Sequence, residues 1–242
     1  MDSILGKAMS RFMAVSFLAL CLIHSGYATD TAGREAKDEV KRIDNAIRVL
    51  NEMSREVDKG IPASLLEDCH GLAIIPDVIK AAFVIGGRLG KGLLIARNEA
   101  GGWSSPCFIR ITGGSAGWQI GVQSADLILV FRTRRSVENF SKGKFTLGAD
   151  VGVAVGPQGR SLEANTDVEL KAEILSYSKS RGLYVGLSLQ GASLHVHAKA
   201  NRNFYGRETG CAEIFEGAAA KNQAAIDNLK LSLDNFIKNA KR

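Results

Sequence analysis

The fold is decided by residues Gly71–Arg97, which read GLAIIPDVIKAAFVIGGRLGKGLLIAR. An apolar run from Gly71 to Ile75 ends at Pro76-Asp77, and two further apolar runs, Ala82–Gly86 and Gly92–Arg97, have glycines between them. Short apolar runs bounded by proline, aspartate or glycine are typical of strands joined by turns. We therefore predict three short strands here, with a glycine-rich turn between the last two.

The same pattern continues through the middle of the chain. Glycine accounts for 26 of the 242 residues, which is about 11% against a usual ~7%, and glycine favours tight turns and close approach of strands over helix. Short apolar or alternating segments then predict further strands at Cys107–Thr112, Trp118–Val122, Leu127–Arg132, Phe145–Val155, Ala172–Lys179, Leu183–Leu189 and Ser193–Ala198.

Helical periodicity replaces this pattern at both ends of the chain. Between residues 30 and 59, apolar side chains recur every three or four positions, as at Ile43, Ile47 and Leu50, which predicts an amphipathic helix. Residues 218–240 have the same spacing. Shorter helices are predicted at Ala63–Asp68 and Arg134–Phe140.

Strands that follow one another, with few long helices between them, argue against a parallel doubly wound sheet. We predict an α+β fold that is β-rich, with a strongly bent antiparallel sheet or barrel flanked by N- and C-terminal helices. The expected organisation is an export signal at residues 1–28, an amphipathic helix at 29–60, a β-rich domain at 61–217 and a C-terminal helix at 218–242.

Residues 1–28 have the features of an export signal. A positively charged start precedes an apolar run, Phe12–Ile23, and small residues then lead up to Ala28. The run is too short for a transmembrane helix. Cys21 leaves lipidation open as an alternative, but Leu20 stands where a lipoprotein signal carries a small residue. We expect cleavage after Ala28 and a periplasmic or secreted protein.

The chain is mildly basic, which favours anionic partners. Its formal net charge is +6, and removal of residues 1–28 takes away two basic residues and one acidic residue to leave +5. Proteins that bind single-stranded nucleic acid add aromatic side chains among their cations. Aromatic residues make up only 7% of this chain, so a nucleic-acid partner is not expected.

Three cysteines follow the export signal: Cys69, Cys107 and Cys211. An exported protein can form disulfides, but three cysteines allow one pair at most. None of them has the CxxC spacing of a redox or zinc site. The favoured interpretation is that they are small buried hydrophobic residues, with one pair left open.

Two glycine-rich motifs resemble reactive loops but lack the context that the chemistry requires. Gly113–Gly117 matches the G-x-S-x-G elbow around Ser115, yet an alternating strand pattern follows where the elbow needs a helix. We predict a hairpin turn instead. Gly86–Gly92 lacks the first glycine and the final Ser or Thr of a phosphate loop; it predicts a turn that presents Arg88 and Lys91. We expect no catalytic residue, and a serine hydrolase is the weakest hypothesis.

His195 and His197 stand two residues apart, so on a strand they would face the same side. Further metal ligands at recognisable spacing are absent from the sequence. We interpret the pair as one face of an exposed strand and expect neither a metal nor another cofactor.

Basic residues gather in two segments, Lys80–Arg97 and Arg132–Lys144, and Lys179 and Arg181 flank a turn. Each cation near an anionic membrane contributes about 1 kcal/mol, so several on one face would support reversible docking. Acidic residues group elsewhere, at Glu163, Asp167, Glu169 and Glu173.

From about Ile61 to Gly217 the chain resembles the SYLF family, which occurs in eukaryotic proteins that link phosphoinositide membranes to actin and in exported bacterial proteins. Several stretches carry the resemblance in the right order. They are Ala82–Arg88 with Gly90–Gly92, Trp103–Pro106, Gln119–Gly121 with Asp126, Gly156-Pro157 with Gly159-Arg160, Tyr177–Leu183, Gly186–Gly191, and Asn201 before Phe204–Gly206.

The resemblance implies a lipid-binding module without enzymatic activity, whose N-terminal helix assists membrane contact. Gln190 departs from the acidic residue expected before Gly191, and the sequence carries no SH3 or FYVE segment. Our first hypothesis is therefore an anionic phospholipid partner, with headgroups held by Lys80, Arg88, Lys91, Lys179 and Arg181. The alternative is a structural or protein-interaction domain of the cell envelope, with a protein partner there.

Overall fold

The computed structural model describes residues 36–55, 60–83, 85–116, 121–157, 171–185, 187, 189–218, 220 and 222–241. One compact unit spans Glu39–Arg242; of the other, Met1–Asp38, only residues 36–38 are described. The expected export signal with Cys21, the residues 118–120 of an expected strand, and Glu163, Asp167 and Glu169 lie outside the described residues. Among the helices that are described, none has both the length and the apolarity to cross a bilayer.

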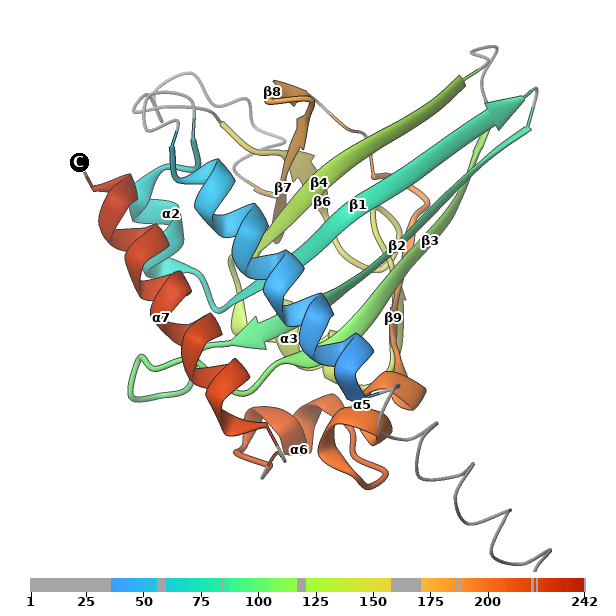
Figure 1. The fold of residues 1–242 in the computed structure, drawn as a ribbon. Coiled ribbons are helices and arrows are strands. Elements are labelled where there is room, and N and C mark those ends of the chain that lie inside the picture. Colours follow the sequence, from blue (N-terminus) through green and yellow to red (C-terminus); the bar gives the residue numbers. More distant parts are fainter. Residues whose placement is uncertain are drawn as a thin grey trace, which may run out of the picture. The chain divides into compact units, whose positions relative to one another are not determined.

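In the described part of the chain, nine strands form one strongly curled sheet (Figure 1), in the order β5-β9-β3-β2-β1-β4-β7-β6 with β8 paired to β7. Their pairs are antiparallel except β6 with β7, which is parallel. The strands are β1 (Gly71–Phe83), β2 (Ile85–Ala96), β3 (Cys107–Ala116), β4 (Gly121–Phe131), β5 (Lys144–Thr146), β6 (Val153–Val155), β7 (Ile174–Ser180), β8 (Leu183–Val185) and β9 (Ser193–Val196).

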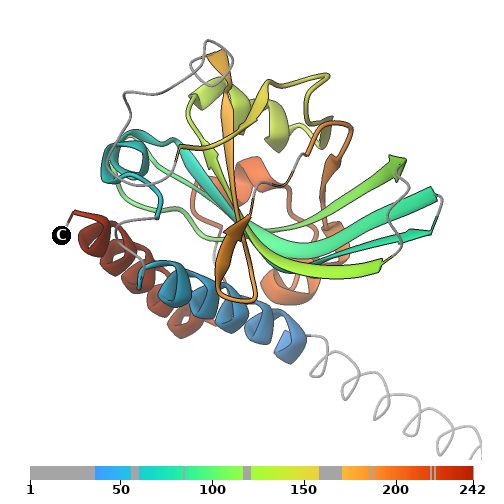
Figure 2. The same cartoon turned by 90° about the horizontal axis from the view of Figure 1, so that it is seen from above.

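Helices cover both faces of this sheet. The described helices are the N-terminal helix over residues 36–53 and α2 (Ala63–Asp68), α3 (Arg134–Ser141), α5 (Ala198–Tyr205), α6 (Cys211–Phe215) and α7 (Gln223–Ala240). The N-terminal helix and α7 lie side by side on one face, and α3 lies on the other, inside the curl (Figure 2). The predicted α+β fold, with a bent sheet and helices at both ends, is confirmed.

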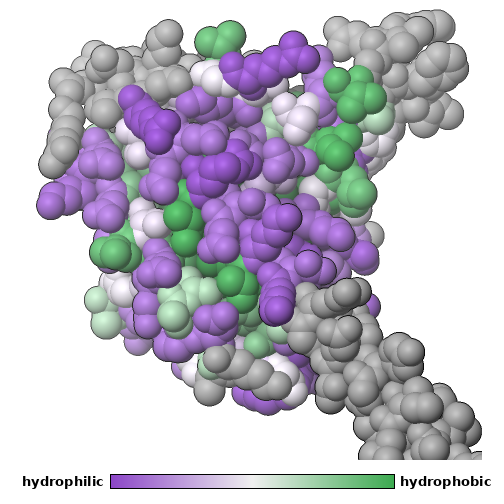
Figure 3. Space-filling model, viewed as in Figure 1, coloured by the Kyte–Doolittle hydropathy of each residue, from purple (hydrophilic) through white to green (hydrophobic). Residues whose placement is uncertain are grey.

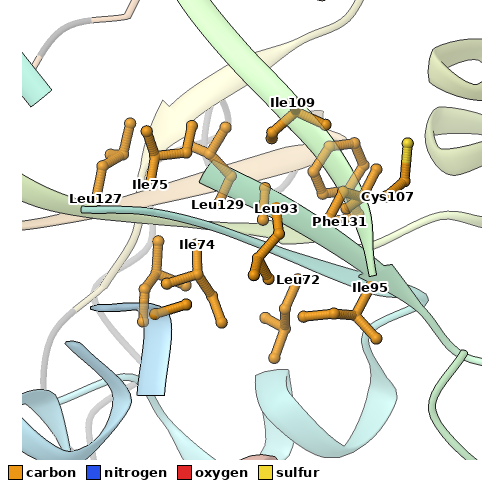
Figure 4. Packing of buried hydrophobic residues seen from close by; sticks show 14 of the residues in the cluster. Leu72, Ile74, Ile75, Leu93, Ile95, Cys107, Ile109, Leu127, Leu129 and Phe131 are labelled. Atoms are coloured by element: carbon orange, nitrogen blue, oxygen red, sulfur yellow. The ribbon is translucent and has the colours of Figure 1, made fainter. Parts of the chain in front are cut away.

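The core fills both faces of the sheet where β1 to β4 run between these helices. Leu72, Ile74 and Leu93 point to one side of the sheet, whereas Ile75 and Leu127 point to the other (Figure 4). All of them are fully buried. Inside the curl, aromatic rings pack edge to face, with 5.5 Å between the ring centroids of Phe140 and Phe145.

The predicted strand end at Pro76-Asp77 is wrong, because the chain absorbs these residues as a bulge and continues to Phe83. Asp77 adopts a left-handed φ of 49°, and its backbone N–H donates to Asp126 Oδ1 over 2.9 Å. A bulge leaves one residue out of the ladder and bends the strand. The Asp126 carboxylate supplies the acceptor that the ladder no longer offers.

The predicted turn at Gly86–Gly92 is also wrong, since these residues lie within β2. β1 bends toward its neighbour β2 so closely that a Cβ on Gly92 would stand 2.2 Å from the Ile74 carbonyl oxygen, and one on Gly90 would stand 2.8 Å from an Ile75 methyl carbon. Glycine is needed here for close approach of two strands rather than for a turn.

A third correction concerns the segment after β9. The predicted strand Ser193–Ala198 ends at Val196, and α5 follows where no helix was predicted. α5 is fixed to the sheet by buried side chains: Asn201 Oδ1 accepts the Phe108 N–H over 2.8 Å, and the Tyr205 hydroxyl donates to the Pro106 carbonyl over 2.8 Å.

Two of the cysteines form a disulfide, so the interpretation of all three as small buried hydrophobic residues is wrong for this pair. Cys107 at the start of β3 is joined to Cys211 at the start of α6, across a sequence separation of 104 residues. Cys69 is free and buried, as that interpretation expected.

Candidate functional site

The predicted headgroup ligands do not form one cluster. Arg88 and Lys91 stand three residues apart on β2, so their side chains leave the sheet on opposite faces. Arg88 is only 9% exposed, and burial lowers the pKa of its guanidinium. Lys80 is its register partner on β1 and shares its face. Lys91 is exposed and remains available to a ligand.

Lys179 and Arg181 lie at another edge of the sheet. Lys179 donates from Nζ to the Glu52 carbonyl over 3.1 Å, which ties it to the end of the N-terminal helix. Arg181 stands in the turn between β7 and β8, exposed and with a left-handed φ of 48°. Lys179 thus has a structural role that the sequence did not indicate.

The sheet assembles a different set of basic side chains around Lys91. Lys91 is the register partner of Arg110 on β3, and Arg110 is the register partner of His195 on β9. Register partners share one face of a sheet. Lys91, Arg110 and His195 therefore form a line across three strands, on the face that carries the N-terminal helix. We call this line the cationic row.

Three further basic groups flank the cationic row. Arg42 of the N-terminal helix approaches His197, with 3.2 Å between Arg42 Nη1 and His197 Nδ1, and its guanidinium carbon lies 5.6 Å from the centroid of the Phe108 ring. Arg42 also forms an ion pair with Glu39 over 2.9 Å. Lys199 follows at the start of α5 and is exposed.

His197 reports the electrostatic character of this surface. Burial lowers its pKa to about 4, and the positive charges of Arg42, Lys91, Arg110 and Lys199 act in the same direction. Like charges nearby disfavour protonation of an imidazole. His197 is therefore neutral at pH 7, and its surroundings favour an anion.

An apolar surface adjoins the cationic row on the same face. Leu89 lies two residues before Lys91, and its register partner is Ile79 on β1. Val122 on β4 pairs with Ala81, two residues after Ile79. The exposed fractions are 49% for Ile79, 54% for Leu89 and 74% for Val122. We call Ile79, Leu89 and Val122 the apolar row; hydrophobic residues gather at this end of the sheet in Figure 3.

The N-terminal helix does not present its apolar side chains to a ligand. Ile43, Ala46 and Leu50 are fully buried. Polar contacts fix the end of the helix as well: Arg48 forms an ion pair with Asp126 over 3.2 Å, and the Tyr184 hydroxyl donates to the Met53 carbonyl over 3.4 Å. The resemblance implied membrane contact through this helix, but in this structure its apolar face is part of the core.

The serine and histidine motifs considered for catalysis or metal binding lie within regular secondary structure or at its ends. Gly113–Ala116 lie within β3, where Ser115 pairs with Gly86, so the hairpin turn predicted over them is wrong; Gly117 lies outside the described residues. His195 Nε2 lies 3.0 Å from Thr112 Oγ1, and His197 follows β9 as the N-cap of α5. The described residues contain no group of three or more potential metal ligands.

A cavity of about 550 Å³ lies elsewhere, between the loop after β2 and the helices α3, α6 and α7. Arg97 and Trp103 line it, with 4.4 Å between the guanidinium carbon and the ring centroid. Arg97 donates to the carbonyls of Leu66 and Gly101, so its charge is used to hold the loop. Acidic and basic side chains are mixed in the lining, which gives no preference for one kind of ligand.

Comparisons with known proteins agree on one family. Residues 112–236 match the model of the Ysc84 family, described as "Las17-binding protein actin regulator". The chain is 38% identical to human "SH3 domain-containing YSC84-like protein 1" over 203 residues, which is 83% of this chain and 59% of that protein. It is 39% identical to Saccharomyces cerevisiae "LAS seventeen-binding protein 3" over 163 residues, 66% of this chain and 35% of that protein.

The chain thus spans about three fifths, or less, of the length of these relatives. The description of the family refers to binding and to actin regulation, and the name of the yeast relative refers to binding.

Proposed function

Because this chain belongs to the Ysc84 family, whose shared domain is the SYLF domain, we propose that it is an exported, non-catalytic module that docks on anionic phospholipid surfaces. One observation carries the proposal: Lys91, Arg110 and His195 line up in register on an accessible face, with Arg42 and Lys199 beside them. Lysine and arginine side chains bind phosphate oxygens through charge-assisted hydrogen bonds. Several of them on one face attract a negatively charged membrane.

Export is the second part of the proposal. It is supported by the charged and apolar pattern of residues 1–28 and by the disulfide between Cys107 and Cys211. Structural disulfides persist mainly in oxidising compartments such as the periplasm or the exterior.

The test compares charge reversals at and away from the cationic row. Residues 1–242 are expressed, and the protein is purified as its host processes it; mass spectrometry of the N-terminus then tests cleavage after Ala28. Co-sedimentation is measured with neutral phosphatidylcholine vesicles and with vesicles containing phosphatidylglycerol or a phosphoinositide. We expect Lys91→Glu with Arg110→Glu to weaken binding to anionic vesicles by tenfold or more and to reduce its salt dependence, since each cation contributes about 1 kcal/mol.

The matched control is Arg135→Glu with Lys238→Glu, which changes the net charge equally at exposed positions of α3 and α7. Retained binding in this control would show that position, and not total charge, matters. If the wild-type protein bound neither kind of vesicle, the proposal would be wrong.

Binding to an envelope protein is the second candidate, supported by the matched family's description as a "Las17-binding protein". It predicts a partner that co-purifies with the wild-type protein and no preference for anionic lipid. The vesicle experiment therefore separates the two candidates.

A further inference from the structure

The apolar row is a cluster and not a scatter of single residues. Among the described residues, six large hydrophobic side chains are exposed, and three of them, Ile79, Leu89 and Val122, lie together at one end of β1, β2 and β4. Singly exposed hydrophobic residues are normal, whereas contiguous ones mark an interaction surface. This end of the sheet therefore has the character of an interaction surface.

The position of the cationic row identifies the chemistry of that partner. Successive side chains on one face of a strand are about 7 Å apart, so Leu89 lies one such step beyond Lys91, away from the half of the sheet that the N-terminal helix covers. Interfacial segments bury their apolar face about 5–10 Å into the boundary between headgroups and acyl chains. Cations and hydrophobic side chains at this spacing match the phosphate and acyl layers of a membrane.

We infer that the apolar row enters the acyl region of an anionic bilayer while the cationic row holds its headgroups. The inference rests on the proposed function and adds the element that inserts: the far end of the sheet rather than the N-terminal helix. Ile43, Ala46 and Leu50 of that helix are buried against the sheet. Ile79, Leu89 and Val122 need no rearrangement to reach lipid.

The experiment replaces the exposed hydrophobic side chains and measures both the affinity for vesicles and the depth to which the apolar row enters the bilayer. Leu89→Ser with Val122→Ser should weaken binding to phosphatidylglycerol-containing vesicles by about tenfold, since it removes several buried CH₂ and CH₃ groups, and should leave the salt dependence unchanged. The control is Leu231→Ser on α7, whose side chain is 61% exposed, and which should bind like the wild type. Thermal unfolding of each variant verifies the fold.

Depth is measured with an environment-sensitive fluorophore on Val122→Cys, compared with the same label on Leu231→Cys. We expect a blue shift, and quenching by nitroxides placed high in the acyl chains, only at position 122. Two results together would overturn the inference and leave the proposed function standing. The label at position 122 would show no blue shift on vesicle binding, and Leu89→Ser with Val122→Ser would bind vesicles as well as the wild type. Absence of binding by the wild-type protein would overturn both.

A second copy of the chain is the other possible cover for the apolar row. Sedimentation velocity without vesicles distinguishes it: a wild-type dimer that becomes monomeric in Leu89→Ser with Val122→Ser would overturn insertion into lipid. A wild-type protein that sediments like the variant supports the membrane as the occupant.

Discussion

The two halves of β1 to β4 differ in what covers them. In the near half, around Leu72–Ile75 and Leu93–Ile95, both faces are buried, by helices on one side and by the curled sheet on the other. In the far half, beyond the Pro76-Asp77 bulge, Ile79 and Leu89 are exposed and Lys91 faces solvent. The near half thus forms part of the hydrophobic core, and the far half leaves side chains exposed for contact with a partner.

The comparison explains why one stretch of sequence contains two patterns. Residues buried on both faces read as an unbroken apolar run, as in Gly71–Ile75. Residues with one open face mix apolar side chains with Lys91 and with the glycines at 90 and 92. The bulge at Asp77 lies at the boundary between the two patterns. Asp126 stabilises the bulge, because its carboxylate accepts hydrogen bonds from the Asp77 N–H and from the Arg48 guanidinium.

The largest loss of stability is expected from a substitution at Gly92, where the two halves of β2 meet. Gly92→Val should prevent folding, at a cost above about 5 kcal/mol, because a Cβ at Gly92 would lie 2.2 Å from the Ile74 carbonyl oxygen. Gly87→Val is the control on the same strand, since a Cβ there meets no atom within 4 Å. Urea unfolding followed by circular dichroism measures both. Equal midpoints for the two variants would show that close approach at Gly92 is not required.

How much of this could be predicted depends on the range of the interactions. The terminal helices follow from the local spacing of residues such as Ile43, Ile47 and Leu50, and the β-rich middle from its glycines and short apolar runs. The role of Gly92 depends on Ile74, a residue of another strand, so the sequence around Gly92 suggested a turn. α5 was missed because it is short and is held by Asn201 and Tyr205 through distant partners.

The headgroup-binding role of the basic residues stays a prediction, and the sequence did not indicate which of them the sheet brings together. Basic residues near Lys91 were evident, yet which of them share its face depends on the register that places Arg110 and His195 beside it. Arg88, only three residues away, was assigned to the same surface and is buried on the other face. The pairing of β2 with β3 and of β3 with β9 joins residues that are far apart in the sequence, and the pattern around Lys91 does not indicate it.

A smaller effect is expected from the disulfide, which fastens α6 to the near half. Cys107→Ala with Cys211→Ala should lower the free energy of unfolding by about 4–5 kcal/mol, as expected for a loop on the order of 100 residues. The variant should become insensitive to reductant in thermal unfolding. Cys69→Ser is the control; it keeps a donor to the Leu66 carbonyl and should unfold at a reductant-dependent temperature. Anionic vesicle binding through the far half should persist in both, and its loss would contradict the separation of the two halves.

The smallest effect is expected from His197, at the border of the near half and the cationic row. Its pKa is about 4 in the folded protein and about 6.5 when exposed. Between these values the unfolded chain binds a proton that the native protein excludes. Stability should therefore decrease as the pH falls from 6.5 to 4, by about 1–2 kcal/mol for this partly exposed group, and should not depend on His197 above pH 7.

His197→Gln removes this dependence while an amide oxygen can still accept from Arg42. The difference in unfolding free energy between wild type and variant should thus change across the window from pH 4 to 6.5 and be constant above it. NMR titration of the His197 ring is a sharper test. Lys91→Glu removes one of the four cations that lower the His197 pKa and leaves the other three in place, so it should raise that pKa. Lys238→Glu on α7 should leave it unchanged. If the His197 pKa were the same in Lys91→Glu as in the wild type, the charge of Lys91 would not reach His197. The cationic row would then be a weaker source of positive potential than the positions of its side chains suggest.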